Sequence, residues 1–341
     1  MYDVDISYAA TKAHVYRTYL IPIDYIKREI AGAGTLEEML GYLHMTAYGE
    51  EIAKLSDVNL PKILEVFKRV FTKRVSMFSR MLGKKERDVV DSYLLKLDIE
   101  RVLEILAEKI ANKKHKDRDY YELPFSKVDY AKLLSAETVD ECIDILLREP
   151  LNIENLYVEL WKRYRSLFII ELGLLSSNYM NLIKNIEKLS GEDKDVIFDM
   201  IGTDIDILNI SIALGPILYG YSPELINKMF IPFRYRISTK ALREAYKIES
   251  KTILKIVPED YKSIVEYYLV GDDVKARVHA QRLILRKIFT VLPRAPISFA
   301  YVFGILRLFE FEYKNLGIIA SGIESGLKAD KIREMIVLDE L

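Results

Sequence analysis

The sequence has a single cysteine, almost no net charge and no long apolar run. Lys and Arg number 50 against 51 Asp and Glu, so the formal net charge is −1. A nucleic-acid-binding protein normally carries a clear basic excess, so no nucleic-acid partner is expected. The one cysteine, Cys142, cannot form an internal disulfide, which fits a reducing cytosolic compartment. Its place on the apolar side of a helical pattern predicts a small buried side chain rather than a nucleophile.

A signal peptide and a membrane span are not expected either. Asp3 and Asp5 stand where a signal peptide would carry basic residues. The most apolar run, Leu167 to Ile170, is followed by Glu171 and is far shorter than the roughly 20 residues that a bilayer needs. Any association with a membrane is therefore expected to run through a partner.

A short pattern of an acid, an apolar or aromatic residue, any residue, a polar residue and an apolar residue occurs three times. The intervals between its copies are 108 and 106 residues. The acid and the polar residue of each copy are Asp98 and Arg101, Asp206 and Asn209, and Glu312 and Asn315.

A second landmark keeps step with the first. Leu123-Pro124-Phe125 recurs as Ile231-Pro232-Phe233, and each proline follows the acid of its copy by 26 residues. Two landmarks with one spacing indicate a threefold internal repeat. We therefore predict an all-α protein of three similar helical-bundle domains, with boundaries at 1–115, 116–225 and 226–341.

Helical periodicity covers nearly the whole chain. Thr35 with Glu38, and Thr138 with Glu141, are capping boxes, in which the threonine bonds the free N–H groups of a helix start and the glutamate reaches back. The equivalent place in the third copy lacks the threonine. Expected helices include one that starts at Pro61 and ends at Gly83, one from Asp88 to Ala111 after a solvated turn over Lys84–Arg87, one long helix over Ile153–Leu175, and one over Ser298–Ser321.

The sequence offers little catalytic or metal-binding chemistry. The four histidines, His14, His44, His115 and His279, are scattered, and none has a second histidine or a carboxylate at metal-ligand spacing. Asp272-Asp273 is better explained as a helix N-cap than as part of a divalent-metal site, because a lysine rather than a further acid follows. We predict no catalytic residue, no cofactor and no metal.

The acid motif has two possible roles. Its three copies could present equivalent polar points to one partner. Alternatively, each acid and the polar residue three positions further on could form hydrogen bonds that lock neighbouring segments within a domain. The second role is favoured, because duplication preserves structural devices at least as readily as contacts.

The C-terminal region resembles the end of the C subunit of archaeal A-type and bacterial V-type ATP synthases, a relative of the eukaryotic vacuolar ATPase d subunit. The resemblance rests on Phe309–Gly322, on the pair Gly326-Leu327 and on the final Ile332–Val337. Thr46–Glu50 and Leu97–Glu100 also look like that family. Arg101 departs from it, because an asparagine is commoner there.

The resemblance implies a funnel-like, pseudo-threefold arrangement of three helical domains. Such a subunit sits on the membrane proteolipid ring, receives the foot of the central shaft and passes torque between them, for proton or sodium transport, without catalysing a reaction. It implies shaft and ring subunits as partners, one copy per complex, and a peripheral location on the cytoplasmic face of the cell membrane.

Lys127, Arg234 and Arg236 follow the repeated prolines and are candidate contacts to acidic or polar loops of the ring, although ordinary domain-joining loops would also carry such residues. Two other functional classes stay open. A free-standing all-α scaffold or adaptor built as a solenoid would show a period of about 34 to 47 residues. An all-α enzyme would need acid clusters that the sequence does not suggest.

Overall fold

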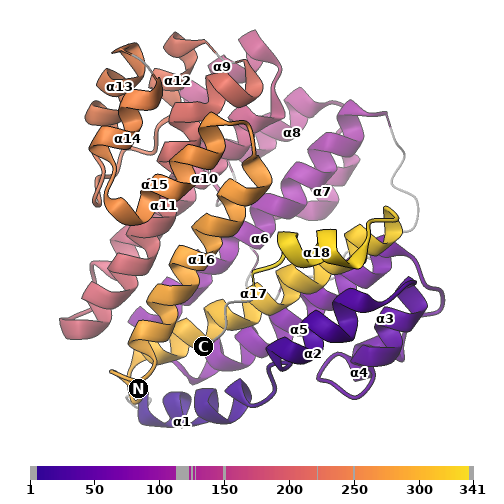
Figure 1. Cartoon of the computed structure of the whole chain (residues 1–341). Coiled ribbons are helices and arrows are strands. Elements are labelled where there is room, and N and C mark those ends of the chain that lie inside the picture. The colour runs from indigo at the N-terminus through magenta and orange to yellow at the C-terminus, as the bar shows by residue number, and fades with distance from the viewer. Residues whose placement is uncertain are drawn as a thin grey trace. The chain divides into compact units, whose positions relative to one another are not determined.

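The computed structural model describes residues 6–112, 123, 126, 128–148, 151–220, 222–248 and 250–337. Over these ranges the chain forms helices joined by turns and contains no β-strand, which confirms the all-α prediction (Figure 1). Within the same ranges, no helix combines the length and the apolar character that crossing a bilayer requires.

Contacts within the chain divide it into two compact units. Unit 1 comprises Met1–Gly83, Asp195–Met200 and Val257–Leu341, and unit 2 comprises Lys84–Lys194 and Ile201–Ile256. The division into consecutive domains 1–115, 116–225 and 226–341 therefore stays a prediction, as does the pseudo-threefold arrangement.

Unit 1 is built on two long helices that pack together, α5 (Leu60–Met81) from its first segment and α17 (Phe299–Glu324) from its last. Over its first turns α17 is apolar and buried around nearly its whole circumference, as expected of a core helix (yellow in Figure 1). Shorter elements complete the unit: α1 (Ile6–Arg17), α2 (Ile23–Arg28), η1 (Ile30–Gly32), α3 (Leu36–Leu43), α4 (Gly49–Ile52), α15 (Glu259–Leu269), α16 (Asp273–Val291) and α18 (Ala329–Met335).

Unit 2 is built on α6 (Lys84–Ile110) and α10 (Leu167–Ile186), which pack along each other. Most of α11 (Gly191–Tyr219) also belongs to this unit. The remaining elements are α7 (Tyr130–Ser135), α8 (Val139–Leu146), α9 (Asn155–Tyr164), α12 (Pro223–Met229), α13 (Thr239–Ile248), η2 (Ser250–Thr252) and α14 (Ile253–Ile256).

The helix starts predicted from capping residues are present. Thr35 Oγ1 accepts a hydrogen bond from the Glu38 N–H at 3.2 Å, and Thr138 Oγ1 accepts one from Glu141 at the same distance. Both glutamates reach back, since their Oε2 atoms accept bonds of 2.7 Å from backbone N–H groups four residues earlier. Pro61 lies in the first turn of α5, as predicted.

The predicted long helix over Ile153–Leu175 is wrong, because the chain breaks between α9 and α10. Arg165 ends α9 in the left-handed region, with φ 49°. A residue in this region is a common way to end a helix, and the Arg165 N–H still bonds the Trp161 carbonyl oxygen. Nη1 of Arg165 also lies 2.7 and 2.8 Å from the two carboxylate oxygens of Asp140. The solvated turn predicted over Lys84–Arg87 is also wrong, since these residues form the first turn of α6.

Candidate functional site

The third acid motif lies at the centre of unit 1, where Glu312 of α17 joins distant segments. Glu312 is 3% exposed. Its Oε2 accepts a hydrogen bond of 2.6 Å from the backbone N–H of Ile21, and its Oε1 accepts one of 2.9 Å from the Tyr48 hydroxyl. Arg74 Nη1 of α5 lies 2.7 Å from the same Oε1 and forms a buried ion pair with the carboxylate. One side chain thus connects α17, α5, the start of α4 and the turn before α2.

The surroundings of Glu312 keep both of its side-chain donors in place. Arg74 is sandwiched by aromatic rings, with its Cζ 5.3 Å from the ring centroid of Tyr48 and 4.7 Å from that of Phe309. Burial and then the neighbouring carboxylate raise the pKa of Tyr48 well above that of a free phenol, so its hydroxyl keeps the proton that it donates. A side chain at Gly49 would clash with the backbone, because a Cβ there would lie 2.0 Å from the His44 carbonyl oxygen.

The amide of the motif forms the same bridge in two copies. Asn315 Nδ2 donates to the Val337 carbonyl at 2.9 Å, and the Val337 N–H donates back to Asn315 Oδ1 at 3.0 Å. Asn209 makes the equivalent pair of bonds with Ile231, at 3.2 and 2.9 Å. In both copies the bridged backbone lies 22 residues further on, just beyond a following short helix.

The second acid, Asp206 of α11, is fully buried in unit 2. Its Oδ2 accepts a hydrogen bond of 3.0 Å from the backbone N–H of Arg236. One turn earlier on α11, Gly202 lets the connecting segment approach, since a Cβ there would lie 2.4 Å from the ring of Tyr235. The acid and the amide of this copy therefore hold both ends of one loop, at Arg236 and at Ile231.

The first copy differs from the other two. Asp98 of α6 is fully buried, and its Oδ1 accepts a hydrogen bond from the Tyr130 hydroxyl of α7. Burial raises the pKa of Asp98, and the Tyr130 hydroxyl and the Arg101 charge oppose that rise. Arg101 takes the place of the amide, and its Cζ lies 5.4 Å from the ring centroid of Tyr130. A guanidinium has only donors, so it cannot exchange the two-way bridge that an asparagine makes.

The structure thus brings the acid and the polar residue of each motif to one packing junction inside its own unit. Only some of the residues that bind the motif acids could be singled out from the sequence. Tyr48 lies in Thr46–Glu50, one of the segments that resembles the family, and Tyr130 follows an aspartate in a repeated Asp-Tyr pair. Arg74 has a weaker signal, a cation among the buried positions of α5.

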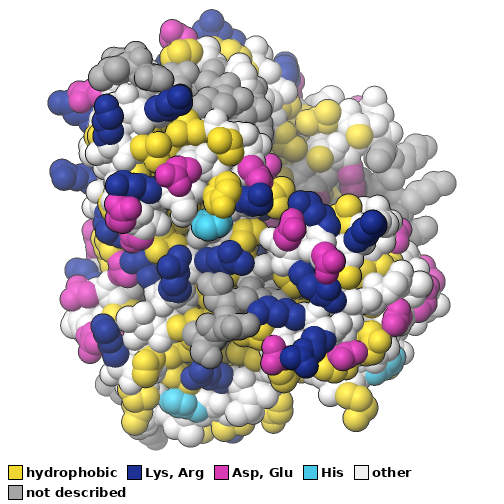
Figure 2. All heavy atoms as spheres, in the orientation of Figure 1, with side chains coloured by type: hydrophobic (Ala, Val, Ile, Leu, Met, Phe, Trp, Pro, Cys, Tyr) yellow, Lys and Arg dark blue, Asp and Glu magenta, His cyan; other side chains and the backbone are white. Residues whose placement is uncertain are grey.

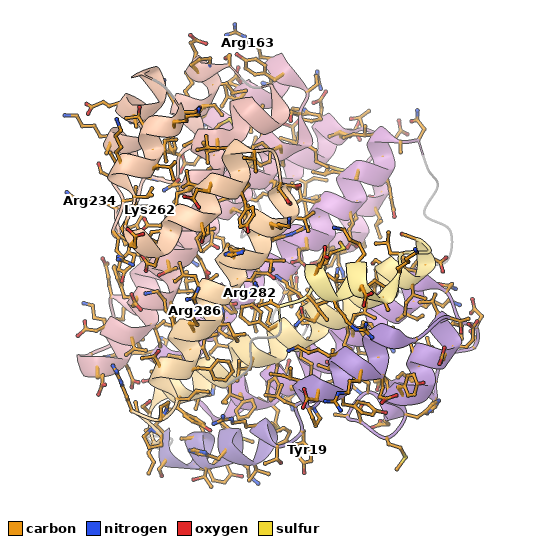
Figure 3. All side chains as sticks on the ribbon, viewed as in Figure 1. Tyr19, Arg163, Arg234, Lys262, Arg282 and Arg286 are labelled. Carbon is orange, nitrogen blue, oxygen red and sulfur yellow. The ribbon has the colours of Figure 1, made fainter. Side chains whose placement is uncertain are left out.

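Three residues, Arg234, Arg236 and Lys127, are the candidate contacts to the ring. Arg234 and Arg236 are exposed in the segment between α12 and α13, and Arg234 is labelled in Figure 3. The backbone N–H of Arg236 donates the bond to Asp206. Lys127 lies outside the described residues. In the part of the chain that the structure describes, no group of three or more His, Cys, Asp or Glu side chains is placed to hold a metal ion.

The fold and the three motifs define an all-α protein in which buried polar side chains connect helices and loops. A model of the family described as ATP synthase (C/AC39) subunit matches residues 9–335, and the chain belongs to this family. It is an ATP synthase subunit, as the resemblance predicted.

Individual relatives agree with the family. The C subunit of the A-type ATP synthase of Pyrococcus abyssi is 23% identical over 322 residues, which cover 90% of this chain and 84% of the relative. The protein of the same name from Pyrococcus horikoshii is 25% identical over 320 residues, with the same coverage. That from Methanocaldococcus jannaschii is 20% identical over 328 residues, or 91% of this chain and 80% of the relative.

Proposed function

We propose that the chain is a non-catalytic central-stalk subunit that couples the rotating shaft of an A/V-type ATP synthase to its membrane proteolipid ring, for proton or sodium transport. In this proposal one copy stands in each complex, on the cytoplasmic face of the cell membrane. Shaft and ring subunits hold it there, and it binds no cofactor. Its three repeats, 1–115, 116–225 and 226–341, form the funnel around a pseudo-threefold axis.

The observation that supports the proposal is that the three motif acids form buried contacts inside the protein. Asp98, Asp206 and Glu312 are each at most 3% exposed and accept hydrogen bonds from their own unit. A general acid or base must instead reach a substrate atom. Buried hydrogen bonds to donors from other segments fix how those segments pack, and a fixed arrangement is what a part that passes torque requires.

Reconstitution tests the coupling role. Membrane vesicles carrying the complex without this chain are expected to hydrolyse ATP but not to pump ions, and the added chain should restore pumping. A variant with Gly41 replaced by alanine, where a Cβ would meet no atom within 4 Å, serves as a folded control that restores pumping equally. Full pumping in vesicles that lack the chain would contradict the proposal.

The candidate ring contacts have a separate test. Charge reversal at Arg234 and Arg236 should weaken the ATP-driven pumping that the added chain restores. The matched control reverses Lys251 and Lys255, which are also exposed residues of unit 2 and give the same change in charge. If both double variants pump as the wild type does, Arg234 and Arg236 belong to an ordinary connecting loop.

A further inference from the structure

The helix α1 of unit 1 exposes large apolar side chains and buries small ones. Tyr8, Val15 and Tyr19, the last just beyond the helix, are 52%, 48% and 53% exposed. The side of α1 that packs into the unit is formed by three fully buried alanines: Ala9, Ala10 and Ala13. A helix at a protein surface normally does the reverse, and a helix with apolar side chains on both sides is normally covered on both. The composition of α1 therefore indicates that something outside this chain covers its outer side.

The outward residues form one row. Tyr8 and Val15 are about 20° apart around the helix, and Lys12 lies between them in the sequence, one turn from each. Tyr19 extends the row in a tight turn, in which its N–H bonds the Tyr16 carbonyl oxygen at 3.0 Å. We call Tyr8, Lys12, Val15 and Tyr19 the α1 face, which is about 16 Å long. In Figure 2 hydrophobic side chains line the lower edge of the view, where Figure 1 draws α1, and Figure 3 labels Tyr19 at that edge.

Contacts within unit 1 hold α1 in place. The ring of His14 stacks on that of Tyr301 in α17, with centroids 4.0 Å apart, and its Nδ1 lies 2.8 Å from the Tyr301 hydroxyl. Its Nε2 lies 2.9 Å from the carbonyl oxygen of Pro296. The ring of Tyr16 meets that of Phe78 in α5 edge-on, with centroids 5.6 Å apart. The α1 face is therefore presented by a helix that is docked on the core of its unit.

The charges on α1 and on the turn beside it are all positive. They are Lys12 and Arg17 of α1 and Arg294 of the turn before α17, and none of the three has an ion pair with a described acid. Ile297, in the same turn, is 67% exposed. The stretches 6–23 and 274–309 contain no Asp or Glu, although the whole chain has a net charge of −1. This surface is therefore both apolar and locally cationic.

We propose that the α1 face lies on an anionic lipid bilayer, with Val15 and the two tyrosine rings among the lipid headgroups. A tyrosine has an apolar ring and a polar hydroxyl, which suit the boundary between lipid and water. Lys and Arg beside an apolar row are the composition with which helices bind the surface of an anionic membrane without crossing it. Lys12 Nζ lies 5.6 Å from the ring centroid of Tyr8, so its charge stays next to the apolar row.

A lipid surface explains the α1 face better than a protein partner does. A stable protein interface buries about 800 Å² on each side, which a row one residue wide does not supply. A bilayer accepts an apolar row without any matching shape, and a small row gives weak, reversible binding that adds to other contacts. The placing of α1 toward the membrane within the complex rests on the proposed function, but its binding to a bare bilayer does not.

Vesicle sedimentation with the whole chain tests the inference. At low salt the chain should bind phosphatidylglycerol vesicles, and it should bind phosphatidylcholine vesicles about tenfold or more weakly, because each cation near an anionic surface adds attraction. V15D should lower the partition coefficient on phosphatidylglycerol vesicles by about tenfold or more, because it removes an apolar contact and adds a charge of the same sign as the lipid.

The chain offers a matched control variant. Val270 is 77% exposed in the same unit, at the end of α15, so V270D makes the same substitution at another exposed valine. It adds the same charge away from the α1 face and should change the partition coefficient by less than about threefold. Circular dichroism checks that both variants are folded.

A label on the α1 face reports contact with lipid directly. Y19C introduces an accessible thiol, and the natural cysteine, Cys142, is buried, so an environment-sensitive fluorophore attaches at position 19. Its emission should shift to the blue and increase when phosphatidylglycerol vesicles are added. The same label on V270C should not respond.

Three results would overturn the inference: no binding to phosphatidylglycerol vesicles, equal losses for V15D and V270D, or binding without a blue shift of the label on Y19C. The first would mean that a protein covers the outer side of α1. The pumping assay separates this inference from the proposed function. If the chain restores pumping but does not bind the vesicles, the proposed function stands alone; if it binds them through the α1 face but does not restore pumping, the inference stands and the coupling role fails.

Discussion

Replacing Arg74 by methionine tests whether the ion pair with Glu312 holds unit 1 together. Methionine keeps most of the volume of the arginine stem but leaves the Glu312 carboxylate buried without its cation. Among the described residues, the carboxylate then retains the N–H of Ile21 and the hydroxyl of Tyr48 as donors. Breaking a buried pair on one side costs about 3–5 kcal/mol, because an uncompensated charge stays in the interior.

Urea unfolding followed by far-UV circular dichroism measures this loss. With an m-value of about 3 kcal/mol per M, the R74M variant should unfold about 1 M or more below the wild type. R80M is the matched control, since Arg80 lies on the same helix and is exposed. Its free energy of unfolding should stay within about 0.5 kcal/mol of the wild type.

A double-mutant cycle separates the pair from its surroundings. E312Q removes the charge but keeps a carbonyl oxygen as acceptor, so R74M combined with E312Q should cost less than the sum of the two single changes. The reasoning would be refuted if R74M cost no more than R80M, or if the two changes at Arg74 and Glu312 were simply additive.

Three further predictions concern the other junctions. N315A and N209A should each lower the free energy of unfolding by about 1–3 kcal/mol, because each removes a two-way bridge to a buried backbone amide; urea midpoints that do not move would contradict this. Burial raises the pKa of Asp98 in the folded state, so its contribution to stability is present at low pH and is lost as the pH rises through that pKa. The stability of D98N relative to the wild type should therefore be higher at pH 7 than at pH 4 in urea titrations, and a difference that is independent of pH would argue against it. G173A should destabilise the protein by about 1–3 kcal/mol, because its Cβ would lie 2.7 Å from the ring of Tyr157. G41A should stabilise it by about 0.5–1 kcal/mol, because a Cβ there meets no atom within 4 Å and alanine favours the helix. Thermal unfolding midpoints that move in the same direction for both variants would oppose this reasoning.

Helix boundaries were predictable where the signal is local. The caps at Thr35 and Thr138 involve atoms within four residues of each other, and both are present. The break at Arg165 was not predictable from periodicity, because the apolar pattern runs through it. The helix ends there at a single left-handed residue, Arg165, which has no glycine or proline beside it to mark the break.

The acid motif was recognisable as a repeat, but its partners were not. Asn209 binds Ile231 and Asn315 binds Val337, each 22 residues further on. No residue type at position 231 or 337 identifies that residue as the partner. Neither Ile231 nor Val337 has a polar side chain, and the bonded atoms are backbone groups that every residue has. Composition and periodicity carry no information about which backbone group a buried amide will bind.

The order of residues was enough to specify an all-helical chain, its caps and its threefold acid pattern, because helix formation and capping depend on neighbours within about one turn. The contacts of Glu312 depend on packing instead. Its partners Ile21, Tyr48 and Arg74 lie 291, 264 and 238 residues away along the chain. A carboxylate accepts a hydrogen bond from any donor that reaches it, so the choice among the donors of this protein was made when α17 packed against α5 and the elements of the first segment.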